Sequence, residues 1–121
     1  MSYNNPQTAA TLSSFKPHPG QMPRDVTSIP QTGKVVVDFW ASWCKPCKTM
    51  APIFTDFSTK PEFSKIAFLK VEADPNPNVL QAYGVKVLPT FLLFKDGKEF
   101  ARVAGVNNHA LIKALEALAS A

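Results

Sequence analysis

The chain has 121 residues, a length suited to one domain, and 45% of them are apolar, which is enough for a buried core. The formal charge of +4 comes from Lys and Arg side chains scattered along the sequence, without the clustered stripe that nucleic-acid binding requires. No apolar stretch approaches the roughly 20 residues of a membrane-spanning helix, and the N-terminus lacks the apolar segment of a secretory signal. We therefore expect no nucleic-acid or membrane partner and a cytoplasmic location, with the mitochondrial matrix as the alternative.

The first 33 residues differ in composition from the rest of the chain. They contain five prolines, few apolar side chains and no period of 2 or 3.6, so we expect an irregular N-terminal segment over residues 1–33. Its expected anchors are Phe15, Val26 and Ile29. The regular patterns begin at Lys34, and residues 34–121 are therefore the predicted domain.

The first half of this domain shows one strand, one helix and a second strand. Residues 35–40 form a nearly continuous apolar run rich in β-branched and aromatic side chains, which is typical of a strand buried on both faces. Apolar residues at i, i+3, i+4 and i+7 then predict a helix that begins near the cysteines. Pro52 lies inside this stripe and is expected to kink the helix. Residues 66–73 are the second predicted strand. The stripe consists of Met50, Ile53, Phe54 and Phe57.

The second half begins with a turn at residues 74–77, whose last proline suits the first position of a short helix. Residues 90–95 are a third predicted strand. The dipeptide Asp96-Gly97 is a strong hairpin signal, so residues 98–104 are expected to return antiparallel.

The final element is a helix capped by Asn107 or Asn108, with Leu111, Leu115 and Leu118 on its buried side. We expect strands joined through helices to be parallel and the last hairpin to make the sheet mixed. Helices must then cover both faces of one sheet, which predicts an α/β fold with three layers, a helix–sheet–helix sandwich.

The only two cysteines, Cys44 and Cys47, are separated by two residues at the predicted junction of strand and helix. A pair in this context indicates a redox site. At a helix N-terminus, unpaired N–H groups favour an anion, so Cys44 is the expected nucleophile. Cys47 lies one turn further in, is expected to be more buried, and can attack the mixed disulfide formed at Cys44. A zinc site would need two more ligands, and inert buried thiols are the other alternative.

Two charged residues near the cysteines in the sequence are expected to influence their reactivity. The Lys45 ammonium, next to Cys44, should favour the thiolate and make the pair somewhat more oxidising, unless it is an ordinary exposed lysine. Asp38 stands within an apolar strand, where burial should raise its pKa and make it a candidate base for Cys47. The alternative is a strand-end aspartate paired with a lysine, for which Lys70 is the candidate.

Further residues accompany the cysteines in a pattern shared with a known family. The pattern consists of Asp38-Phe39-Trp40-Ala41-Ser42-Trp43-Cys44-Lys45-Pro46-Cys47-Lys48, followed by Pro52, Lys70, Leu88-Pro89-Thr90, Phe94-Lys95-Asp96-Gly97 and Gly105. It resembles the thioredoxin family and covers the whole predicted domain. The resemblance implies that Cys44 attacks, that Cys47 resolves, and that the two form a redox-active disulfide. It also implies proton transfer at Asp38 with Lys70 near it, and a cis-proline at Pro89 opposite the disulfide.

The resemblance further implies a substrate-binding surface and a function. The residues that match this surface are Trp43, Lys45, Pro46, Ala73, Leu88, Pro89, Ala104, Gly105 and Val106. The implied protein is a monomeric protein-disulfide reductase without metal or bound cofactor, whose electrons come from an NADPH-dependent flavoprotein, a thioredoxin reductase. The alternatives are an oxidase or isomerase, and a thioredoxin-fold binding factor without redox turnover.

This chain departs from the family pattern at two places. The family usually has Gly at position 45, so the reduction potential and partner preference are expected to differ. The family also begins with a strand and a helix before its central strand, whereas residues 13–33 carry four prolines and no helical pattern. We therefore expect the first strand–helix unit to be shortened, distorted or absent, which would uncover part of the sheet edge.

Overall fold

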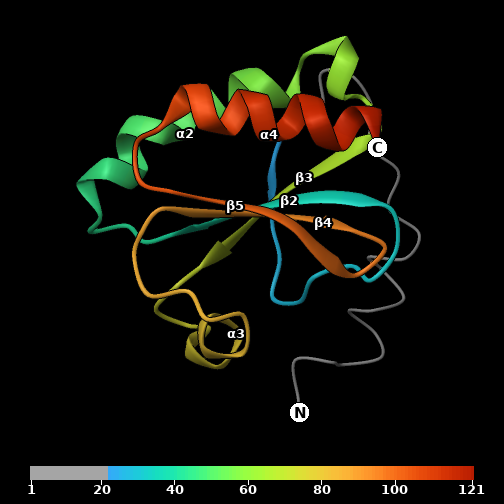
Figure 1. The fold of residues 1–121 in the computed structure, drawn as a ribbon. Helices are drawn as coiled ribbons and strands as arrows, with labels where there is room; N and C mark the ends of the chain where they lie inside the picture. Colours follow the sequence, from blue (N-terminus) through green and yellow to red (C-terminus); the bar gives the residue numbers. More distant parts are fainter. Residues whose placement is uncertain (1–21) are drawn as a thin grey trace.

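A mixed five-stranded sheet forms the centre of the computed structural model, which describes residues 22–121 (Figure 1). The strand order is β1-β3-β2-β4-β5. β1 and β2 both pair parallel with β3, whereas β4 is antiparallel to β2 and β5 is antiparallel to β4. The strands are β1 (Arg24–Asp25), β2 (Lys34–Trp40), β3 (Ile66–Glu72), β4 (Thr90–Lys95) and β5 (Lys98–Ala104).

Helices cover both faces of this sheet, as the sequence predicted. In Figure 1, α2 and α4 lie on one face and α3 lies on the other. Within residues 22–121, no helix combines the length and the apolar character needed to cross a bilayer. The helices are α2 (Lys45–Ser58), the 3₁₀ turn η2 (Pro61–Phe63), α3 (Pro77–Ala82) and α4 (Asn108–Ser120).

The hydrophobic core is divided by the sheet into two clusters. Val36 belongs to the cluster under α2 and α4, whereas Val35 and Val37 belong to the cluster on the α3 side. This alternation follows from the period of 2 along a strand and explains why the middle of β2 is apolar throughout. In the first cluster, the Phe54 ring of α2 lies 5.2 Å from the Phe68 ring and 5.5 Å from the Phe91 ring, measured between centroids. The predicted stripe of α2 is therefore its buried face.

The expectation that helix-linked strands are parallel is correct for β2 and β3 and wrong for β3 and β4. The 14 residues of α2 rise about 21 Å, close to the roughly 23 Å of a seven-residue strand, so the chain returns to the start of the sheet before it enters β3. The six residues of α3 rise only about 9 Å, so the chain stays near the end of β3 where it left the sheet. It then enters β4 in the opposite direction, beside β2.

The described part of the N-terminal segment joins the sheet through two residues. Arg24 and Asp25 form β1, opposite Leu69 and Lys70 of β3. Residues 26–33 contain no helix, whereas residues 13–21 of the segment predicted to have a shortened, distorted or absent strand–helix unit lie outside the described residues. Ile29 is buried in the α3-side cluster, with Val26 packed against it. The third predicted anchor, Phe15, lies outside the described residues, and the boundary at residue 34 remains a prediction.

Turn and cap residues fix the ends of the last three elements. Asp96 and Gly97 have φ values of 51° and 82°, the left-handed conformation that a tight two-residue hairpin requires at both positions. Asn107, rather than Asn108, is the N-cap of α4, and its side chain accepts the N–H of Ala110 at 3.2 Å.

Candidate active site

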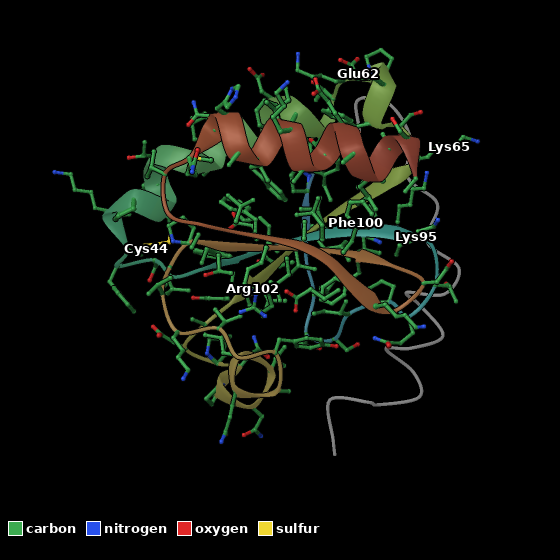
Figure 2. All side chains as sticks on the ribbon, in the orientation of Figure 1. Cys44, Glu62, Lys65, Lys95, Phe100 and Arg102 are labelled. Atoms are coloured by element: carbon green, nitrogen blue, oxygen red, sulfur yellow. A yellow bond between two sulfur atoms is a disulfide. The ribbon has the colours of Figure 1, made fainter. Side chains whose placement is uncertain are left out.

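Cys44 lies at the junction of β2 and α2 (Figure 2) and is joined to Cys47 of α2 by a disulfide. Cys44 is the N-cap of α2, and its Sγ accepts the backbone N–H of Cys47 at 3.2 Å. The sulfur therefore occupies the place of a capping oxygen, where free N–H groups and the helix dipole favour negative charge. Pro46 stands at the start of the helix, where its missing N–H costs nothing.

The two cysteines differ in access rather than in depth. Cys44 is 4% exposed and Cys47 is 3% exposed, so Cys47 is the more buried of the two only by a narrow margin in the disulfide form. Both pack against Ala41 and Ala73, the latter from the segment after β3. Cys44 alone, however, lines the groove beside the disulfide. An incoming sulfur in that groove therefore meets Cys44 first.

This groove has a volume of about 810 Å³ and is bordered by the β2–α2 junction on one side and by α3 on the other. Five of the residues matched to a substrate surface line it together with Cys44, namely Trp43, Lys45, Pro46, Ala73 and Leu88. Sequence reasoning missed the opposite wall, which consists of Asp74, Pro77, Leu80, Gln81, Gly84, Val85 and Lys86. The turn and short helix predicted at residues 74–83 were the available signal for this wall.

Trp43 links the two sides of the groove. Its side chain is 67% exposed, and its Nε1–H donates to both carboxylate oxygens of Asp74, at 2.9 and 3.2 Å. The indole follows β2 and the carboxylate follows β3, so the bond ties two neighbouring strand ends together. An exposed aromatic surface held in one orientation can contact an incoming chain at a low entropic cost.

Arg102 of β5 holds the far wall of the groove in place (Figure 2). Its guanidinium donates to the carbonyl oxygens of Tyr83 at 2.7 Å and Gly84 at 3.1 Å, where the chain leaves α3. The same group forms a salt bridge with Glu99 at 3.0 Å. A cation at the carbonyl end of a helix is favourable, so Arg102 anchors the wall at the point where the chain leaves α3.

Pro89 follows Leu88, which lines the groove, and directly precedes β4. The Leu88–Pro89 peptide bond is cis, and the Pro89 carbonyl accepts the N–H of Gly105 at 2.8 Å. This bond, together with the pairing of Thr90 with Ala104, places residues 104–106 beside Pro89. Ala104, Gly105 and Val106 do not line the groove itself, so they form a separate part of the surface.

Asp38 is a buried carboxylate on the face of the sheet that α2 covers. It alternates with Val37 and Phe39, which belong to the opposite cluster, and is only 1% exposed. Its Oδ1 finds no hydrogen-bond partner among residues 22–121. Burial raises the pKa of Asp38 to about 7. The positive charge of Lys70 acts to lower this pKa, and the negative charge of Asp25 acts to raise it. As the fifth of seven strand residues, Asp38 is not the strand-end aspartate of the alternative reading.

Lys70 stands directly opposite Asp38 in β3, as the sequence suggested. Its Nζ lies 4.7 Å from the centroid of the Trp40 ring. The Trp40 Nε1–H in turn donates to Asp25 Oδ1 at 3.0 Å. Asp25 and Trp40 were not assigned roles from the sequence, because only the pairing of β1 with β3 brings Asp25 to this position.

The described residues contain no group of three or more His, Cys, Asp or Glu side chains arranged to hold a metal ion. The site consists of a disulfide at a helix N-terminus, a buried carboxylate on the same face of the sheet, and a groove lined by Cys44. Such a site can exchange disulfides with another molecule.

Known proteins share this arrangement. The family model described as Thioredoxin matches residues 24–117, so the match begins inside the segment predicted to be irregular. The chain is 43% identical over 91 residues to Thioredoxin-1 of Saccharomyces cerevisiae, covering 75% of this chain and 86% of that protein. It is 40% identical over 81 residues to a thioredoxin of Malassezia sympodialis, covering 67% of this chain and 77% of the relative.

Solved structures give the same result. The crystal structure of the Malassezia sympodialis thioredoxin superposes with a TM-score of 0.77 at 31% identity, over 87% of this chain and 96% of that one. Thioredoxin f from spinach chloroplast superposes with a TM-score of 0.73 at 25% identity, over 80% of this chain and 93% of that one.

Proposed function

The chain belongs to the thioredoxin family and is a thiol–disulfide oxidoreductase, and from this premise we propose that it reduces disulfides of protein substrates through Cys44 and Cys47. One observation carries the assignment of the two roles. The Sγ of Cys44 lies at the α2 N-cap and borders the groove, whereas Cys47 does not border it. The accessible and electrostatically favoured sulfur is the attacking one.

In the first step, the Cys44 thiolate attacks one sulfur of a substrate disulfide bound in the groove. The substrate S–S bond breaks as the mixed disulfide with Cys44 forms, and the released substrate thiolate takes up a proton. The N–H of Cys47 and the helix N-terminus stabilise the attacking anion.

In the second step, Cys47 transfers its proton to the Asp38 carboxylate and attacks Cys44 Sγ. The bond between Cys44 and the substrate breaks, the Cys44–Cys47 disulfide forms, and the second substrate sulfur leaves as a thiolate and is protonated. The exchange moves two electrons to the substrate. Of the two protons that the substrate sulfurs take up, one comes from Cys47 by way of Asp38 and the other from water, because Cys44 reacts as a thiolate. A carboxyl group with a pKa of about 7 suits this task, because it can accept and return a proton near neutral pH.

The oxidised protein must then be reduced again. Thioredoxin family proteins act with reductases, and we propose that an NADPH-dependent flavoprotein thioredoxin reductase restores the two thiols. The required electrons enter by the same exchange in reverse, with Cys44 as the accessible sulfur.

The test is insulin reduction with dithiothreitol as the final electron source, together with trapping of the mixed disulfide. Cys47→Ser should lose turnover and accumulate a covalent adduct with a disulfide substrate, since nothing resolves the bond at Cys44. The matched variant Cys44→Ser should lose both turnover and the adduct. An adduct that forms equally well on Cys44→Ser would show that the two roles are assigned wrongly. If the wild type is as inactive as the two variants, the result would instead favour a thioredoxin-fold binding factor without redox turnover.

An oxidase or isomerase is the second candidate, and the placement of Lys45 favours it. This exposed lysine lies next to Cys44 on the groove, where its charge stabilises the thiolate and hence the reduced state of the pair. Equilibration with glutathione buffers would separate the two candidates. A potential near that of thioredoxins supports the reductase, and one well above the glutathione couple supports the oxidase.

A further inference from the structure

Two carboxylates flank the Lys70 ammonium in one row across the sheet. Lys70 of β3 is paired with Asp25 of β1 on one side and with Asp38 of β2 on the other. Registered residues of adjacent parallel strands point to the same face, so all three side chains share the face that α2 covers. Lys70 therefore stands between two groups that compete for its charge.

The Lys70 ammonium lies over the indole ring that is hydrogen-bonded to Asp25. Trp40, two residues after Asp38 and on the same face, donates its Nε1–H to Asp25 Oδ1 at 3.0 Å. The Lys70 Nζ lies 4.7 Å from the centroid of the same indole ring, in cation–π geometry. Asp38 Oδ1 meanwhile has no hydrogen-bond partner among residues 22–121. Asp25, Trp40 and Lys70 thus form a connected group beside the unsatisfied carboxylate.

The two carboxylates also differ in exposure. Asp25 is exposed at the short edge strand β1, whereas Asp38 is 1% exposed. Water can therefore solvate the Asp25 charge but not the Asp38 charge, and ionisation of Asp38 depends strongly on its neighbours. The charged groups on this face are Asp25 from β1 and Lys70 and Glu72 from β3, and the β4 neighbour, Phe91, is apolar. The titratable side chain that α2 buries is Cys47.

We propose that Asp25 is a positioning residue for the resolving step: it holds Lys70 against Trp40 and so keeps Asp38 a strong proton acceptor. This inference rests on the proposed role of Asp38 as the base for Cys47. The Asp25 charge acts in the same direction by opposing a second negative charge nearby. Without Asp25, Lys70 is free to pair with Asp38, which then becomes a stronger acid and a weaker base.

The test variant is Asp25→Asn, which removes the charge while its amide oxygen can still accept the Trp40 N–H. The residue is exposed, so the variant should fold. Asp25 and Asp38 are two strand spacings apart, about 9.6 Å, and a charge at that distance shifts a titration by roughly half a pH unit. We expect the carboxyl carbon-13 NMR titration of Asp38, measured in the oxidised protein, to move to lower pH by about half a unit or more.

Glu116→Gln is the matched control, because it removes one exposed carboxylate from α4, outside this row. It should leave the Asp38 titration unchanged. Equal shifts in the two variants, or no shift in Asp25→Asn, would overturn the inference, since a specific effect of Asp25 would then be absent.

The catalytic readout is the pH dependence of substrate release from the mixed disulfide in a single turnover. The acidic limb of this profile should move with the titration in Asp25→Asn. If Asp38→Asn leaves the profile unchanged, the proposed role of Asp38 as base fails. If Asp38→Asn flattens the profile but Asp25→Asn does not move it, the inference about Asp25 alone is overturned.

Discussion

Replacing Asp38 by Asn should stabilise the oxidised protein, and the gain should grow with pH. Burial raises the pKa of Asp38 from 3.8 to about 7, so the folded protein retains a proton that the unfolded chain releases. Below pH 3.8 the carboxyl group is protonated in both states, and the wild type has its full free energy of unfolding. This free energy falls as the pH rises from about 3.8 to about 7, because the unfolded chain releases the proton and the folded protein does not. A difference of about three pH units at roughly 1.4 kcal/mol per unit corresponds to about 4 kcal/mol. Asn has nearly the same shape and no charge, so it avoids this loss.

Urea unfolding of the oxidised wild type and variant, at intervals between pH 4 and pH 9, measures this difference. The two free energies of unfolding should nearly coincide at pH 4 and differ by about 4 kcal/mol at pH 9. Asp56→Asn, on the exposed face of α2, is the control for removing a carboxylate and should change the free energy of unfolding only slightly. If the wild-type and Asp38→Asn curves run parallel across this range, Asp38 does not titrate as a buried group and the reasoning is refuted.

Three further predictions test separate parts of the structure. Lys45→Gly should make the reduction potential more negative by about 10 mV, because an exposed charge contributes only about 0.5 kcal/mol; an unchanged potential against glutathione would contradict tuning by Lys45. Phe54→Ala should lower the free energy of unfolding by about 3–5 kcal/mol, whereas the exposed Phe100→Ala should change it little in the same urea titration. Arg102→Leu should raise KM for insulin while leaving the rate with a small aromatic disulfide nearly unchanged, because the carbonyls that anchor the α3 wall lose their donor; equal effects on both substrates would argue against that role.

Features that depend on short stretches of sequence were predictable. The strands β4 and β5 have the predicted limits because Asp96 and Gly97 impose a tight turn between them. The position of Cys44 at the start of α2 followed from the change of pattern after β2, and Asp38 was recognisable as one charge within an apolar strand. In each case the physical cause lies within about ten residues of the feature.

Features that depend on pairing between distant segments were not predictable in the same way. The direction of β4 depends on how far α3 carries the chain along the sheet. The six residues of α3 do not by themselves show this, because the direction also depends on which strand β4 pairs with. The far wall of the groove is tied to β5 by the hydrogen bond from Arg102 to Gly84, which lies eighteen residues earlier in the chain. Asp25 reaches the site only through its register with Lys70.

The energetics of Asp38 distinguish a functional residue from a structural one. A carboxylate that is buried beside an apolar core, with one oxygen unpaired among residues 22–121, reduces stability at neutral and higher pH. The sheet has no structural need for it, because its position on β2 would accept a neutral side chain of the same size. The same burial brings its pKa to about 7, where a proton can be exchanged with a thiol. A substitution that stabilises the fold while slowing the resolving step is therefore the expected signature of this residue, and no purely structural role predicts both effects together.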